Sequence, residues 1–139
     1  MDLPGHDIMN GLGKIIATPK YGKEAVSFNG INTGYTLIDF WRWSSSDLVS
    51  NTMRGLLAEL IVGTALKFDP AIPRQEWEAF DLIIDNRIRI EVKSSAYIQS
   101  WNQKKFSPIL FSIKPTKYWD TSTGIESETR RHSDIYGCS

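Results

Sequence analysis

The sequence contains one cysteine, Cys138, and two histidines among its 139 residues. A single cysteine excludes a disulfide within the chain, and it excludes the cysteine-rich sites that hold structural zinc. Proteins without paired cysteines are typical of reducing compartments, so we expect a cytoplasmic location.

Long hydrophobic runs are also missing. The most apolar stretch, residues 56–66, includes Glu59 and is shorter than the roughly 20 residues that span a bilayer. The first 13 residues have neither the basic start nor the apolar run of a secretory signal. The sequence therefore predicts a protein without a membrane segment or a membrane partner.

Net charge is the third feature that the chain lacks, because 16 basic and 16 acidic residues cancel. The charges are nevertheless placed unevenly. Residues 69–85 hold five acids and one base, Arg74, and residues 87–117 hold seven bases and one acid, Glu91. An acidic cluster followed by a basic one suits a site that binds cations and then a polyanion. Opposite charges paired between neighbouring strands would explain the same pattern.

The length is that of one domain with a hydrophobic core. Residues 1–34 have weak periodicity and predict an irregular N-terminal segment, with at most a short helix or strand, ahead of a core domain over residues 35–139. Residues 35–43 are β-branched and aromatic, which favours a strand.

A helix is predicted from about residue 46 to residue 67. Serines at 44–46 are N-cap candidates, and Pro70 and Pro73 end the helix. The residues expected on its apolar face are Val49, Met53, Leu56, Leu57, Leu60, Ile61 and Thr64.

Beyond the helix the hydrophobic period changes to two, which is typical of strands. The first two strands expected here form a hairpin. Residues 116–133 are polar and turn-like, with a short helix expected around Glu126. The expected strands cover residues 79–85, 87–94 and 109–115, with a last strand beginning at Ile135 and Tyr136.

Register decides what Asp81 meets in this hairpin. A two-residue loop would pair Asp81 with Ile90 and place a carboxylate on the apolar face. A three-residue loop, residues 85–87, pairs Asp81 with Glu91 and keeps the apolar residues on one face. Hydrophobic patterning therefore selects the second register, which also places Lys93 on the face of the two carboxylates.

Two like charges directly opposite each other destabilise a sheet unless a cation neutralises them. A divalent cation would do so, and hard oxygen ligands favour Mg²⁺ or Mn²⁺ over Zn²⁺. A plain salt bridge from Lys93 is the alternative, and it stays open. Glu59 is a third acid at the edge of the helix's apolar face. Gly55 and Gly63 flank it and leave room beside it, unless they serve close helix packing.

A helix with a partly buried glutamate precedes a strand with Asp81 and a strand with Glu91 and Lys93. Over residues 46–97 this order resembles the PD-(D/E)XK nuclease superfamily, which has the restriction-endonuclease-like fold, and Glu59 matches the helix glutamate of that family. The resemblance implies an α/β core with a mixed central sheet flanked by helices. Because the family usually continues with a helix and a further strand, it also implies a core truncated at the C-terminus.

The resemblance further implies a site for Mg²⁺, with Mn²⁺ as a substitute, in which Lys93 activates the attacking water. The implied activity is hydrolysis of phosphodiester bonds in DNA, as in an endonuclease of restriction or repair type, and the assembly expected is a homodimer. The pattern does not distinguish DNA from RNA. Phe80 stands where the motif often has proline, a position without a chemical role. The implied catalytic residues are Glu59, Asp81, Glu91 and Lys93, and the implied metal ligands are Glu59, Asp81, Glu91 and the Val92 carbonyl.

Residues just after the motif are expected to contact nucleic acid, by donating hydrogen bonds to phosphate or by stacking on bases. They are Ser95, Tyr97, Gln99, Lys104 and Lys105.

Two other interpretations stay open. The first is an inactive member of the same fold that binds nucleic acid or a protein partner. The second is a small α/β interaction protein whose charges lie on the surface, which requires the two-residue loop or a direct salt bridge from Lys93. His132 is expected to be a surface histidine.

Overall fold

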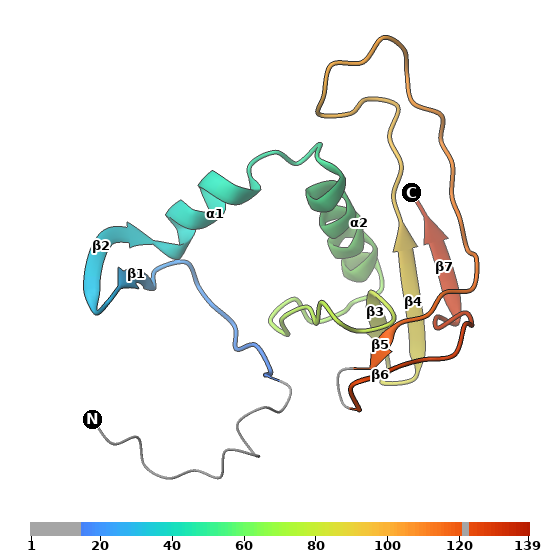
Figure 1. Ribbon diagram of the computed structural model, residues 1–139, viewed down its shortest axis with the longest axis horizontal. Coiled ribbons are helices and arrows are strands. Elements are labelled where there is room, and N and C mark those ends of the chain that lie inside the picture. The colour runs from blue at the N-terminus through green and yellow to red at the C-terminus, as the bar shows by residue number, and fades with distance from the viewer. Residues whose placement is uncertain (1–14, 121–122) are drawn as a thin grey trace.

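The chain forms a hairpin followed by a helix, and then a second helix packed on a mixed sheet (Figure 1). The computed structural model describes residues 15–120 and 123–139. Its mixed α/β class agrees with the prediction. In chain order the elements are β1 (Ala25–Phe28), β2 (Ile31–Thr36), α1 (Leu37–Ser45), α2 (Asn51–Ala65), β3 (Leu82–Ile84), β4 (Ile88–Lys93), β5 (Trp119–Asp120), β6 (Ile125–Glu126) and β7 (Ile135–Cys138).

The central sheet has the strand order β3-β4-β7, with β4 in the middle. β3 runs antiparallel to β4 and β7 runs parallel to it, so the sheet is mixed, as predicted. The predicted hairpin and the strand beginning at Ile135 are thereby confirmed. Because β4 has a neighbour on both edges, it is the strand best placed to carry buried residues.

The hydrophobic core lies between α2 and the sheet. Leu82, Ile90 and Val92 are buried there. Ala58 and Val62 of α2 pack against them, and because these two residues are four positions apart they share one side of the helix.

The predicted helix over residues 46–67 is confirmed as the shorter α2. Its N-cap is Ser50, whose Oγ accepts a hydrogen bond from the backbone N–H of Met53 at 3.3 Å. The predicted apolar face is wrong in part, because Leu60 and Ile61 are 47% and 61% exposed. The side of the helix that carries Ala58 and Val62 packs on the sheet instead.

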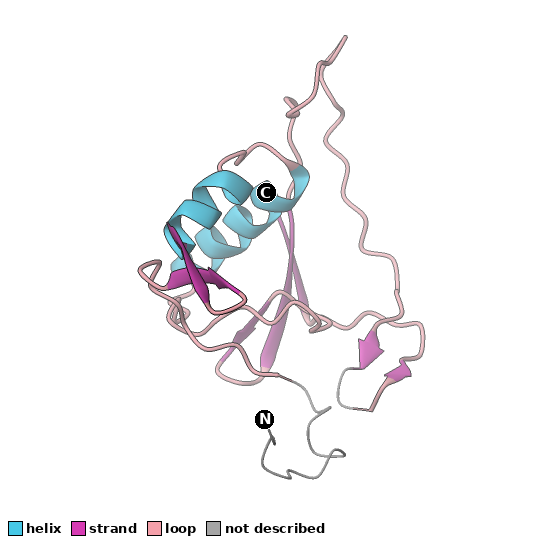
Figure 2. Ribbon diagram, turned by 60° about the vertical axis from the view of Figure 1, so that its left-hand side comes forward, coloured by secondary structure: helices cyan, strands magenta, loops and turns pink. Residues whose placement is uncertain are grey.

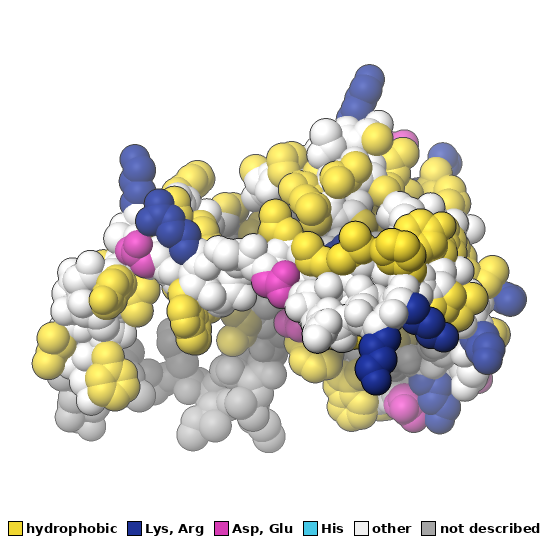
Figure 3. Space-filling model, turned by 90° about the horizontal axis from the view of Figure 1, so that it is seen from above, with side chains coloured by type: hydrophobic (Ala, Val, Ile, Leu, Met, Phe, Trp, Pro, Cys, Tyr) yellow, Lys and Arg dark blue, Asp and Glu magenta, His cyan; other side chains and the backbone are white. Residues whose placement is uncertain are grey.

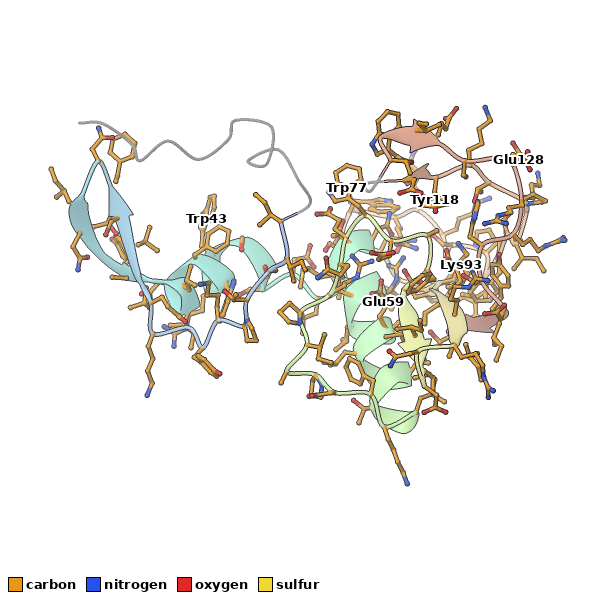
Figure 4. All side chains as sticks on the ribbon, turned by 90° about the horizontal axis from the view of Figure 1, so that it is seen from below. Trp43, Glu59, Trp77, Lys93, Tyr118 and Glu128 are labelled. Carbon is orange, nitrogen blue, oxygen red and sulfur yellow. The ribbon has the colours of Figure 1, made fainter. Side chains whose placement is uncertain are left out.

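The strand predicted over residues 35–43 is wrong, because β2 ends at Thr36 and α1 begins at Leu37. The carboxylate of Asp39 accepts a hydrogen bond from the backbone N–H of Thr36 at 2.9 Å, and this capping contact starts the helix. Figure 4 shows Trp43 on α1, away from α2 and the central sheet. Capping therefore outweighs the strand preference of the aromatic residues in this segment.

A hairpin, β1-β2, begins in the segment predicted to be irregular and extends two residues beyond it. Its turn contains Asn29 and Gly30, which have positive φ angles of 50° and 76°. Tight hairpin turns require positive φ angles, and asparagine and glycine adopt them more readily than most residues. The Asn-Gly pair is the sequence signal for this hairpin. The predicted boundary between residues 34 and 35 falls inside β2, and residues 1–14 lie outside the described part of the chain.

Three expectations for the C-terminal part are wrong. Residues 109–115, all of them described, lie outside the strands, and Leu110 is 76% exposed, since no neighbouring strand pairs with this segment. The hairpin β5-β6 takes the place of the helix expected around Glu126. His132 is 5% exposed rather than at the surface, because its ring packs edge-on against that of Tyr118 at a centroid distance of 4.7 Å.

Hydrophobic side chains occupy much of the surface, as Figure 3 shows for one face. The accessible surface area is 11752 Å², whereas a folded monomer of 15.8 kDa exposes about 7300 Å². Loops account for much of the chain (Figure 2), and extended loops expose more area than packed elements do. Among the described residues, no helix is long and apolar enough to cross a membrane.

Two glycines of α2 test how closely this helix packs. A Cβ added at Gly63 would lie 2.9 Å from a ring carbon of Phe68, whereas one added at Gly55 would meet no described atom within 4 Å. We expect Gly63→Ala to lower the free energy of unfolding by about 1–3 kcal/mol through overpacking. Gly55→Ala should raise it by up to about 1 kcal/mol through helix propensity. Urea unfolding measures both, and a stabilised Gly63→Ala variant would contradict close packing of Phe68.

Candidate functional site

The hairpin register places Asp81 beside β4, as predicted. Leu82 pairs with Ile90, which leaves residues 85–87 as a three-residue turn. The first two turn residues have φ angles of 52°, a conformation that aspartate and asparagine tolerate better than most side chains. The two-residue loop therefore does not form. It was one of two alternative conditions for the interpretation as a small interaction protein with surface charges.

The carboxylate of Asp81 is tied to the central strand. Its Oδ2 accepts a hydrogen bond from the backbone N–H of Val92 at 2.6 Å, and its own N–H donates to the carbonyl oxygen of Ile90 at 2.9 Å. The Asp81 side chain is 16% exposed. Because the N–H and C=O of one strand residue point to the same edge, the Val92 carbonyl also leaves β4 on the Asp81 side.

Glu59 reaches the same place from α2 through an arginine. The guanidinium of Arg74 binds both carboxylate oxygens of Glu59, with Nε–Oε2 at 2.5 Å and Nη2–Oε1 at 3.1 Å. Its Nη2 also lies 3.5 Å from Oδ1 of Asp81. The Glu59 side chain is 12% exposed, which agrees with the predicted partly buried position (Figure 4).

Arg74 is a site residue that the sequence reasoning missed. Its signal was present, because it is the one base among the five acids of residues 69–85. Its position depends on the irregular path of the chain between α2 and β3, which no periodic pattern predicts.

Glu91 and Lys93 form the second ion pair of the site. Lys93 Nζ lies 2.5 Å from Oε1 of Glu91, and the two side chains are 34% and 24% exposed. Both residues are on β4, the strand that packs on α2, and Figure 4 labels Lys93 there. The direct salt bridge that was the alternative to a metal ion is therefore present in this structure.

Burial raises the pKa of Asp81 from its ordinary value of 3.8 to about 6. The Val92 N–H opposes this rise by hydrogen bonding to the charged form, while the neighbouring carboxylates of Glu59 and Glu91 add to it and Arg74 reduces it. A buried carboxylate whose pKa is raised beside other carboxylates is typical of binding and catalytic sites, and also of structural ion-pair networks.

A cavity of about 760 Å³ opens beside these residues. Glu59, Arg74 and Asp81 belong to the polar part of its wall, whereas Glu91 and Lys93 do not line it. The other polar residues of the wall are Lys67, Asp69, Gln75, Glu78 and Asp85. Most of the remaining wall is apolar, including Phe68 and Phe80. Charged groups next to apolar walls are weakly solvated, which strengthens their attraction for a cation.

The donor set has the chemistry that a hard divalent cation prefers, namely the carboxylates of Asp81 and Glu91 and the Val92 carbonyl. In the described part of the chain, however, no group of three His, Cys, Asp or Glu side chains is arranged to hold a metal ion. Arg74 and Lys93 are instead paired with the carboxylates. These groups are of the ligand types that a divalent cation prefers, and in this structure the partners of the carboxylates are the side-chain cations Arg74 and Lys93.

The residues predicted to contact nucleic acid follow β4. Tyr97, Lys104 and Lys105 are exposed, so a large ligand can reach them. Ser95 instead extends the sheet, because its backbone N–H donates to the carbonyl oxygen of Ser139 at 2.9 Å.

Two glutamines hold this loop in shape. Gln99 accepts a hydrogen bond from Nη1 of Arg54 at 3.1 Å and so fastens the loop to α2. Gln103 accepts from the Gln99 backbone N–H at 2.7 Å and donates to the Tyr97 carbonyl oxygen at 3.2 Å. Of the two, Gln99 was predicted as a nucleic-acid contact, whereas Gln103 was missed, since a glutamine in a polar loop gives no distinctive signal.

Comparison of the chain with protein-family models, with curated proteins and with solved structures gave no match. The family resemblance thus rests on the residues of the motif and their order along the chain.

The buried carboxylate of Asp81 should make stability depend on pH. Because its pKa is raised in the folded state, the folded chain binds more protons than the unfolded chain between pH 3.8 and about 6. The free energy of unfolding should fall as the pH rises through this window, by up to about 3 kcal/mol for this shift. Asp81→Asn keeps an acceptor for Val92 and should therefore be more stable than the unmodified chain at pH 7.5, as measured by urea unfolding.

Asp134→Asn is the control with the opposite sign. Hydrogen bonds from Arg89 lower the pKa of Asp134, so its charge stabilises the fold above its unfolded pKa and this stabilisation is lost at acid pH. The Asp134→Asn variant should be less stable at pH 7.5. If Asp81→Asn were also less stable at that pH, the Asp81 carboxylate would be a structural anchor rather than a cost to folding.

Proposed function

We propose that the chain is a divalent-cation-dependent nuclease with a restriction-endonuclease-like core, which hydrolyses phosphodiester bonds in DNA. The observation that carries this proposal is the position of Asp81, which connects the strand that carries Glu91 with the helix that carries Glu59. Asp81 bonds to β4 next to Glu91, and it shares Arg74 with Glu59. A cytoplasmic location and a homodimer belong to the same proposal.

In this proposal Asp81, Glu91 and the Val92 carbonyl would hold Mg²⁺ or Mn²⁺, and Glu59 would join them. The ion, when bound, supplies Lewis-acid stabilisation of the charge that develops on the phosphate. The hydrogen bond from Val92 keeps the Asp81 carboxylate at a fixed place on the strand edge, so the ligand is positioned before any ion arrives. This positioning lowers the cost of ordering the site on binding.

Lys93 is proposed to act on the water and the phosphate. An ammonium group has three donors, and the contact with Glu91 uses one of them. The others are available to orient the attacking water and to donate to a phosphate oxygen. Its 34% exposure on the edge of the site gives a substrate access to the Nζ atom.

The loop after β4 is proposed to hold the nucleic acid. Lys104 and Lys105 would contact phosphates, and Tyr97 would stack on a base. The hydrogen bonds made by Gln103 keep the loop folded without a ligand, which would reduce the ordering cost of binding.

An inactive nucleic-acid-binding module of the same fold is the second candidate function. The observation that favours it is that Arg74 and Lys93 already form ion pairs with the acids. A module of this kind would keep the acids as a structural network.

Cleavage of supercoiled plasmid DNA tests the proposal. We expect cleavage with Mg²⁺, none with EDTA, and a loss of at least about 100-fold in rate for Lys93→Ala, because a positioned acid–base or electrostatic group contributes about that much. Arg42→Ala is the control, since Arg42 pairs with Asp39 on α1 at 3.5 Å and lies outside the basic stretch of residues 87–117. This control should cut at the unmodified rate.

Cleavage that persists at full rate in Lys93→Ala would point to a contaminant or another site. A chain that binds a fluorescent oligonucleotide in EDTA, measured by anisotropy, but never cuts it would favour the inactive module.

A further inference from the structure

Arg74 is the side-chain cation that contacts both Glu59 and Asp81. Its guanidinium covers both oxygens of Glu59, and its Nη2 lies 3.5 Å from Oδ1 of Asp81. The other Asp81 oxygen, Oδ2, accepts from Val92. The oxygen of Asp81 that remains for a cation is therefore the one that faces Arg74.

We propose that Arg74 is a placeholder cation that a divalent ion must displace from Asp81 and Glu59. The inference rests on the proposed function, because it concerns the metal site of that function. A Mg²⁺ ion needs oxygens at about 2.1 Å. A guanidinium nitrogen that occupies the same side of the same oxygens cannot stay there, so the two cations compete.

Glu59, Asp81 and Arg74 differ in how easily each side chain could move out of the site into solvent. Glu59 and Asp81 are 12% and 16% exposed, whereas Arg74 is 37% exposed. Arg74 also lies on the irregular segment between α2 and β3, directly after Pro73. Its departure would therefore place a charged group in water without opening a hole in the core, while the acids stay in position.

Competition gives Arg74 a defined effect on metal affinity. Removing its side chain should strengthen metal binding, although it removes two contacts that hold the site together.

Calorimetric titration with Mn²⁺ at pH 7.5 and low salt tests this inference. Arg74→Ala should bind Mn²⁺ about 10-fold more tightly than the unmodified chain, which corresponds to about 1.4 kcal/mol. Arg74→Lys keeps the charge but lacks the two-pronged fork, so its affinity should lie between the two. Arg42→Ala is the matched control, because Arg42 forms an ion pair with Asp39 on α1 at 3.5 Å. Its affinity should be unchanged.

Equal or weaker Mn²⁺ binding by a folded Arg74→Ala variant, with the unmodified circular dichroism spectrum, would overturn the inference and leave the metal site standing. If neither the unmodified chain nor any variant binds Mn²⁺, the metal site itself is wrong, and the inference fails with it. Asp81→Asn should abolish binding in both backgrounds.

A second measurement does not depend on the variants folding. The Nε–H of Arg74 donates to Glu59, so its ¹⁵N–¹H resonance should differ from that of a solvated arginine. Addition of Mg²⁺ to the unmodified chain should move this resonance to the solvated position. A resonance that stays in place while Mg²⁺ binds would show that Arg74 is not displaced.

Discussion

The hydrogen bond from the backbone N–H of Val92 to the carboxylate of Asp81 is the contact on which the site depends. β3 begins one residue later, at Leu82, so the carboxylate supplies an acceptor where the strand's own pairing has ended. Leaving a buried N–H of this kind unpaired costs about 1–3 kcal/mol. The same bond sets the level of the carboxylate along β4, next to Glu91. One contact thus completes the sheet edge and fixes the spacing of the acids.

This contact also places the charge of Asp81 in a partly buried position, where a charge lowers the stability of the fold. Three hydrophobic side chains, Leu82, Ile90 and Val92, are buried in the described residues, so the core is small. Burial of the neighbouring Asp81 raises its pKa and consumes part of the stability that this core supplies. An amide would accept the Val92 hydrogen bond without that cost. A carboxylate at this position therefore adds a charge that the Val92 hydrogen bond does not require, and that charge pairs with Arg74.

The sequence predicted the parts of the molecule in which one rule decides the outcome. The hairpin register followed from keeping Leu82 and Ile90 on one apolar face, and the structure has that pairing. The packing side of α2 was not predictable in the same way, because apolar residues lie around most of its circumference. α1 was missed because the capping contact of Asp39 outweighed strand propensity. Arg74 was missed because its place depends on how an irregular segment folds back across α2.

The two cations of the site suit different tasks. The planar fork of Arg74 matches the two oxygens of Glu59, whereas the compact ammonium of Lys93 has rotatable donors that can turn from Glu91 toward a substrate. The net charge of the site also distinguishes Arg74 from Lys93. Three carboxylates with Lys93 leave two negative charges, which equal the charge of one divalent ion in magnitude. With Arg74 bound the balance is one negative charge, so the proposed exchange of the arginine for a divalent ion would bring the site to neutrality. A site balanced in this way holds its shape without metal and keeps a net attraction for the ion that would replace Arg74.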